Sequence, residues 1–94
     1  MSIVVRFNPS NLTGEKYDST TQQLEEGGVE FPPEGMLLHV CFGSDDNLRV
    51  SEIWDSREQF EAFGERLMPV LSEAGIEFSG EPEVFEVRNL EKRA

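Results

Sequence analysis

The chain has little with which to build a cross-linked or membrane-spanning protein. Its one cysteine, Cys41, excludes an internal disulfide and is typical of a reducing compartment. No apolar run approaches the ~20 residues needed to span a bilayer. The first residues also lack the basic start and the long apolar stretch of a signal peptide. From these absences we predict a cytoplasmic protein with no membrane partner.

Basic residues are also scarce. Eight Lys and Arg residues stand against 19 Asp and Glu, which gives a formal net charge of -11. A field of this sign repels phosphate backbones, so we predict no nucleic-acid partner and interpret the acidic surface as solubilising. The sequence also has no glycine-rich phosphate loop and no Gly-x-Ser-x-Gly motif, so nucleotide-dependent and serine-hydrolase chemistry find no support.

What the chain does contain is the material for one domain, residues 1–94. Apolar residues make up 37% of the sequence and aromatic residues 10%, which is enough for a packed core. Four runs alternate apolar and polar residues as half-buried strands do. They cover residues 3–7, 37–42, 50–54 and 84–88.

This alternation predicts two different faces for the sheet, because successive side chains of a strand point to opposite sides. The apolar face collects Ile3, Val5, Phe7, Leu38, Val40, Phe42, Ile53, Phe85 and Val87. The mixed face collects Val4, Arg6, Asn8, Leu37, His39, Cys41, Val50, Glu52, Trp54, Val84, Glu86 and Arg88. We predict that helices cover the apolar face, so the mixed face needs another cover.

Two helices are predicted between the strands. The first covers residues 13–26, with Thr13 as N-cap inside a hydrophobic staple of Leu12 and Tyr17, and it ends at Gly27 and Gly28. The second begins at the overlapping capping boxes of residues 55–59 and ends at Gly75. Its core-facing stripe is Phe60, Phe63, Leu67, Leu71 and Ala74. Pro69 predicts a kink, or a break into two helices near Met68.

The order strand, helix, strand, strand, helix, strand predicts an α+β, ferredoxin-like fold with a four-stranded antiparallel sheet. Residues 44–47 form a hairpin loop, which places His39 opposite Glu52 and Cys41 opposite Val50. A bare mixed face would expose a large apolar patch to water. We therefore predict a homodimer in which two sheets pack face to face as an α/β barrel.

One segment, Val50 to Phe60, joins a strand that ends in Trp54 to a Ser- and Glu-rich cap and a Phe-bearing helix. It resembles the dimeric α/β-barrel superfamily, which includes the antibiotic biosynthesis monooxygenase-like proteins. The resemblance implies a cofactor-free oxygenase, a haem-degrading enzyme, an isomerase or a protein without known activity. Trp54 and Asn8 match residues of the haem-degrading members. Their helix histidine would fall near Gly64 or Glu65, where this chain has none, so we expect no cofactor.

The candidate site lies on the mixed face. His39 is the predicted general base, Glu52 orients it, Trp54 stacks on the ligand, and Arg6 or Arg88 holds an oxyanion. Asn8 and Glu86 complete the predicted ligand-binding set. The same residues also suit a structural network that satisfies polar groups buried by dimerisation. One His and one Cys without recognised ligand spacing indicate no metal site.

Three functions follow from this pattern. In the first, the dimer binds a small, partly aromatic molecule between sheet and helices. In the second, it is a cofactor-independent monooxygenase or isomerase that uses His39 as base. In the third, it is a structural dimer without a ligand. A cavity in contact with His39 separates the first two functions from the third.

Overall fold

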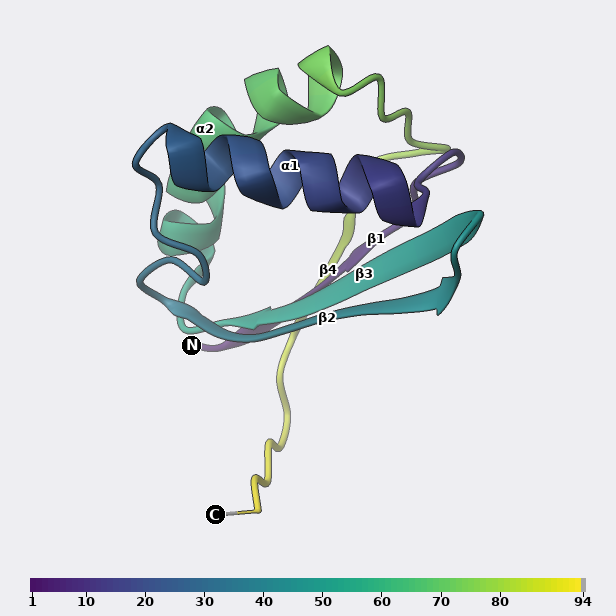
Figure 1. Ribbon diagram of the computed structural model, residues 1–94. Coiled ribbons are helices and arrows are strands. Elements are labelled where there is room, and N and C mark those ends of the chain that lie inside the picture. Colours follow the sequence, from purple (N-terminus) through teal and green to yellow (C-terminus); the bar gives the residue numbers. More distant parts are fainter. Residues whose placement is uncertain (94) are drawn as a thin grey trace.

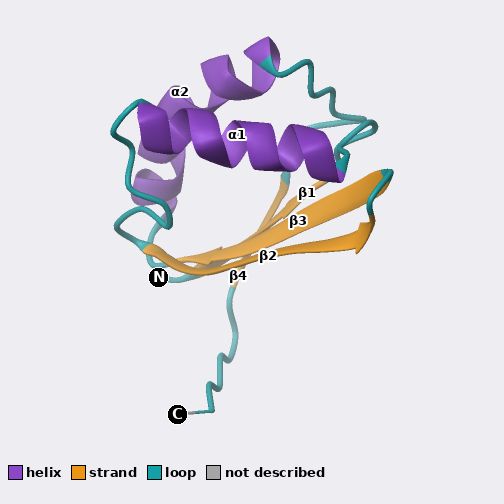
Figure 2. Cartoon of the chain, viewed as in Figure 1, coloured by secondary structure: helices purple, strands orange, loops and turns teal. Residues whose placement is uncertain are grey.

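The computed structural model describes residues 1–93 and has the element order that the sequence predicts. The elements are β1 (Ile3–Phe7), α1 (Gly14–Glu26), β2 (Met36–Ser44), β3 (Asn47–Trp54), α2 (Arg57–Glu73) and β4 (Glu83–Glu86). The strands form one antiparallel sheet in the order β2-β3-β1-β4. Both helices cover the same face of this sheet (Figures 1 and 2). The ferredoxin-like α+β prediction is confirmed.

Both helices begin where their caps were predicted. The Thr13 hydroxyl accepts a hydrogen bond from the Lys16 amide at 3.2 Å, and the Ser56 hydroxyl accepts one from the Gln59 amide at 3.3 Å. α2 remains helical through Pro69, so of the two predicted alternatives, a kink or a break near Met68, the break does not occur. Proline removes one intrahelical hydrogen bond. The apolar stripe continues on both sides of Pro69, and its packing on the sheet keeps the two halves in one helix.

The β2–β3 hairpin has the predicted register. Ser44 pairs with Asn47, and His39 therefore lies opposite Glu52 and Cys41 opposite Val50. Gly43 adopts a φ of 115°, and a Cβ at this position would lie 2.7 Å from the Asn47 carbonyl oxygen. Only glycine fits there without moving the backbone. The hairpin geometry thus fixes which β2 and β3 side chains share a face.

The predicted assignment of faces is wrong in part. Val5 and Ile3 face the helices as expected, but they lie opposite Glu52 and Trp54. Paired residues of antiparallel strands share a face, so Glu52 and Trp54 also point to the helices, and His39 follows Glu52. Cys41, Val50 and Val84 lie on the same side. The prediction assigned the wrong β1 residues to the face shared with His39, Glu52 and Trp54. Alternation within a single strand separates its two faces but does not show which face matches which in the neighbouring strand.

The core lies between the sheet and the helices, and Trp54 stands at its centre with 0% of its surface exposed. One cluster around it comprises Ile3, Val5, Leu24, Met36, Trp54 and Phe63. A second cluster at the hairpin end comprises Leu12, Leu48, Val50, Leu71 and Ile76. Within residues 1–93, no helix has the length and apolar character needed to cross a membrane.

The other face of the sheet is open. An apolar row crosses all four strands there, from Leu38 through Ile53 and Val4 to Phe85. The two outer members, Leu38 and Phe85, are 49% and 53% exposed. Arg6, predicted to share a face with His39, lies on this open face, between Ser51 and Glu83.

Candidate functional site

Four side chains form a hydrogen-bonded line from α1 across the sheet. The Tyr17 hydroxyl lies 2.7 Å from His39 Nε2, and His39 Nδ1 lies 2.7 Å from Glu52 Oε2. The Trp54 indole N–H donates to Glu52 Oε1 at 2.9 Å. The chain has one Tyr, one His and one Trp, and Glu52 joins His39 to Trp54. We call this arrangement the Tyr17–Trp54 network.

The backbone places each member of the network. The hairpin register sets His39 beside Glu52, and the two-residue spacing of a strand puts Trp54 on the same face as Glu52. Tyr17 lies in the first turns of α1, one helical turn before the buried Thr20. The sequence predicted the His39–Glu52 pair and missed the role of Tyr17, which it counted as part of an apolar staple. The available signal was that this staple residue carries a hydroxyl that needs a partner when it faces the sheet.

The chemistry of the donors fixes most of the proton positions. An indole nitrogen only donates, so Glu52 Oε1 accepts from Trp54. The second carboxylate oxygen accepts the Nδ1 proton of His39. In neutral histidine this leaves Nε2 as the acceptor for the Tyr17 hydroxyl. No buried polar side-chain atom within residues 1–93 lacks a hydrogen-bond partner.

Burial alters the acidity of two groups in this region. Partial burial raises the pKa of the Tyr17 hydroxyl above its usual value, and electrostatic interactions with Cys41, Glu52 and Asp18 raise it further. Burial likewise raises the pKa of the Cys41 thiol, with a smaller contribution from Asp18. The thiolate is therefore disfavoured, which argues against Cys41 as a nucleophile.

The raised pKa of Tyr17 predicts a pH dependence at the alkaline end. The stability gained from the protonated phenol is fully present below pH ~10, the ordinary tyrosine pKa, and is lost as pH rises through the raised value. Absorbance at 295 nm follows Tyr17 alone, because the chain has no other tyrosine. The midpoint should be higher in the native protein than in urea, and Tyr17→Phe should remove the transition. Equal midpoints in both states would contradict the assigned environment.

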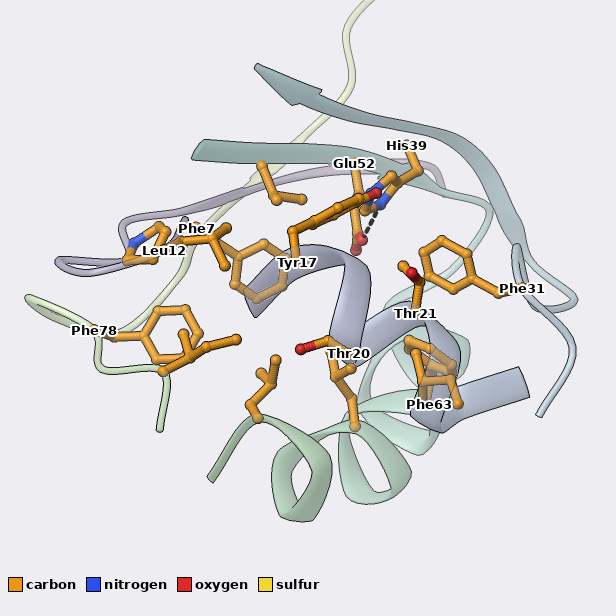
Figure 3. Close-up of a pocket in the computed structure, with 16 residues that line it drawn as sticks. Phe7, Leu12, Tyr17, Thr20, Thr21, Phe31, His39, Glu52, Phe63 and Phe78 are labelled. Atoms are coloured by element: carbon orange, nitrogen blue, oxygen red, sulfur yellow. Dashed lines mark hydrogen bonds and ion pairs between the residues drawn. The ribbon is translucent and has the colours of Figure 1, made fainter. Parts of the chain in front are cut away.

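Two cavities meet beside the network. The inner cavity has a volume of about 60 Å³ and lies between the sheet, both helices and the segment after α2 (Figure 3). The outer groove, between α2 and the segment 78–82, has a volume of about 360 Å³. Both walls are almost entirely apolar. The residues common to both are Phe7, Glu52, Phe63, Leu67 and Phe78. We call the combined space the cleft.

All five predicted ligand-binding residues lie outside the cleft. Trp54 is fully buried in the core and lines neither cavity, so the predicted stacking on a ligand is not possible in this structure. Arg6 is exposed on the open face of the sheet, and Glu86 and Arg88 are exposed at and beyond the end of β4. The Asn8 side chain is exposed, while its backbone carbonyl accepts hydrogen bonds from Ser79. Neither Arg6 nor Arg88 lines the cleft, so the predicted oxyanion contact is not formed there. The described part of the chain also contains no group of three His, Cys, Asp or Glu side chains arranged to hold a metal ion.

Comparison with known proteins supports the fold. No protein-family model matches the chain. No curated protein matches it at a significant level. Among solved structures, it is similar to a protein from Chloroflexus aurantiacus J-10-fl whose name places it with the antibiotic biosynthesis monooxygenases. The TM-score is 0.57 at 18% identity, over 97% of this chain and 95% of the other. At that identity the likeness establishes the fold alone, and this fold is the predicted ferredoxin-like α+β architecture.

Proposed function

We propose that this protein binds a small molecule with an aromatic body in the cleft between its sheet and its helices. The observation that carries the proposal is that the outer groove and the inner cavity lie side by side and share part of their lining, including Phe7, Glu52 and Phe63. Ligand sites in proteins are concave and mostly apolar, with a few polar groups that fix orientation. Here Tyr17, His39 and Glu52 provide those polar groups in the inner cavity, and Glu52 alone of the network also lines the outer groove.

The cavity volumes decide where such a ligand would lie. An apolar cavity of roughly 150 Å³ is known to bind benzene, whereas the inner cavity measures about 60 Å³. A ring system does not fit there without a rearrangement. The outer groove, at about 360 Å³, accommodates one. The aromatic body therefore occupies the outer groove, and a small substituent reaches toward Glu52 and the network.

A second candidate function is proton transfer by the network, as in a cofactor-independent monooxygenase or isomerase. Both nitrogens of His39 are engaged, one with Glu52 and one with Tyr17. His39 would thus act as base through Tyr17, accepting the phenolic proton while Tyr17 removes a proton from the ligand. The name of the Chloroflexus protein with the same fold is consistent with this candidate.

One probe tests both candidates in the same sample. 2-Tetralone is an uncharged aromatic ketone with an acidic C–H bond. We expect it to shift the amide NMR signals of Phe63, Gly64 and Leu67 with a single saturable curve. Leu67 lines both cavities, so the larger side chain of Leu67→Phe should weaken this binding at least tenfold. Leu37→Phe, at an exposed position on β2, is the matched control.

The same sample in deuterium oxide separates binding from catalysis. Accelerated C–H exchange of bound 2-tetralone that is lost in His39→Ala and kept in Cys41→Ser would support proton transfer. Binding without accelerated exchange supports the binding function alone. Unchanged signals up to the solubility limit of the ketone would overturn the proposed function.

We further propose that two copies pair through the open face of the sheet. The exposed apolar row from Leu38 to Phe85 is the surface that pairing would cover. Two of the eight basic residues, Arg6 and Arg49, lie on this face, so it is less negative than the chain as a whole. Even with Glu83 on the same face, two copies would meet there with less repulsion than their charge of -11 each implies.

Sedimentation equilibrium at about 0.15 M salt tests the pairing. We expect twice the chain mass of 10.7 kDa for the native protein. Leu38→Asp should raise the dimer dissociation constant at least about a hundredfold, because each of two copies loses about 1.5–3 kcal/mol of apolar burial. Leu90→Asp, outside the sheet, should leave it unchanged. A native mass of 10.7 kDa at micromolar concentration would contradict the proposal.

A further inference from the structure

The cleft has no group that compensates a negative charge. Among residues 1–93, neither the inner cavity nor the outer groove is lined by a lysine or an arginine. The charged side chains at the groove are the carboxylates of Glu52, Glu61 and Glu81. Glu52, 4% exposed, stands where the two cavities meet. The imidazole of His39 is the one cationic group that could form, and both of its nitrogens already have partners.

An anionic ligand would therefore lose its hydration without gaining a counter-charge. Moving an ionised group into an apolar site is strongly unfavourable unless the site pairs it. Glu61 and Glu81 are exposed, so salt screens much of their repulsion, but it does not restore the lost hydration. Desolvation is thus the main barrier to an anion, and the surface carboxylates add to it.

Each of the two segments that border the outer groove, α2 and residues 78–82, contributes one glycine beside open space. Gly64 lies inside α2, where glycine is less favourable than alanine. A Cβ at Gly64 would meet no atom within 4 Å, and the same holds for Gly80 in the segment before β4. Close packing therefore does not require glycine at either position. Both residues line the groove, so any larger side chain there would take up ligand space.

We infer that the outer groove selects uncharged aromatic ring systems, and that Gly64 determines the largest ring system it accepts. This inference rests on the proposed binding function and adds to it the charge and the size of the ligand. The residues that carry it are the apolar side chains Phe7, Phe60, Phe63, Leu67 and Phe78, the missing cation, and the empty space beside Gly64.

Two dyes with the same ring system test the charge preference. N-phenyl-1-naphthylamine is uncharged, and 8-anilinonaphthalene-1-sulfonate carries one sulfonate on that framework. By fluorescence titration of the folded protein, we expect one site for the uncharged dye, displaced by 2-tetralone. Binding of the sulfonate at that site should be at least twentyfold weaker, and 0.5 M salt should recover only a small part of this difference.

Gly64→Leu tests the size limit. It should weaken binding of N-phenyl-1-naphthylamine at least tenfold while changing the affinity for the smaller 2-tetralone less than threefold. Ala62→Leu, on an exposed position of the same helix outside the groove, should change neither. Gly80→Leu is the second variant, and it should act in the same direction as Gly64→Leu.

The outcomes distinguish failure of the proposed binding function from failure of the charge and size selection. Failure of the native protein to bind 2-tetralone overturns the proposed function itself. If 2-tetralone binds, equal displaceable affinity for both dyes overturns the charge selection. Unchanged affinity of folded Gly64→Leu and Gly80→Leu for the uncharged dye overturns the assignment of the groove.

Discussion

Replacing Trp54 with alanine should reduce the free energy of unfolding by about 3–5 kcal/mol. Trp54 has no exposed surface, and its ring centroid lies 5.8 Å from Phe60 and 5.7 Å from Phe63. Truncation would leave a cavity between the sheet and α2 and an unpaired Glu52 oxygen. Because a domain of this size has a total stability of only about 5–15 kcal/mol, the variant should be close to unfolded at 37 °C.

Urea unfolding followed by far-UV circular dichroism, at fixed protein concentration, measures this loss. Circular dichroism is needed because the mutation removes the only tryptophan. Trp54→Phe keeps a ring and loses the indole N–H, so it should lose clearly less stability than Trp54→Ala. Met68→Ala, at a side chain that is 56% exposed, should stay within about 0.5 kcal/mol of the native value. A loss below 1 kcal/mol in Trp54→Ala would contradict the central place of Trp54 in the core.

Local signals explain why the sequence predicted the elements well. Thr13 and Ser56 cap their helices because the interaction that defines a cap spans only three residues. The His39–Glu52 pairing was predictable for a similar reason, since loop length alone sets the register of a hairpin. The relation of β1 to that hairpin depends on residues some 45 positions away in the sequence. Local alternation carries no information on it, and the predicted face was therefore wrong.

The site shows the same division between local and tertiary information. Glu52 and Trp54 are close in sequence, and their contact with His39 followed from the hairpin. Tyr17 joins the network only because α1 lies over the sheet, and the cleft exists only because α2 and the segment 78–82 stand apart. Arg6 and Arg88 were predicted to serve the site because a barrel interior was assumed to lie on the mixed face. Arg6 is exposed on the open face and Arg88 is exposed beyond the end of β4, so neither lines the cleft.

Replacing Glu52 with alanine should also have a large effect, because it leaves the buried Trp54 N–H and the partly buried His39 N–H without an acceptor. His39 Nδ1–H and Trp54 Nε1–H both donate to Glu52, which is 4% exposed. An unsatisfied buried group costs about 1–3 kcal/mol, and the partly buried His39 adds less than that, so the expected loss of unfolding free energy is at least about 1–3 kcal/mol. Urea unfolding checks the value. A loss within 0.5 kcal/mol would mean that Glu52 carries no structural role.

Glu52→Gln separates loss of charge from loss of the hydrogen bonds. The glutamine oxygen still accepts from Trp54, but its NH₂ group faces His39 Nδ1 and needs an acceptor there. The His39 proton should therefore move to Nε2, and Tyr17 should become the acceptor of that bond. Long-range ¹H–¹⁵N NMR reads the tautomer directly, because the chain has one histidine. We expect Nδ1–H in the native protein and Nε2–H in Glu52→Gln.

If His39 has the same tautomer in both proteins, the donors and acceptors assigned to the hydrogen bonds of the network are wrong. A further outcome concerns catalysis. Suppose that Glu52→Gln changes the tautomer and remains folded but no longer exchanges the protons of bound 2-tetralone. The orientation of His39 then serves chemistry as well as packing.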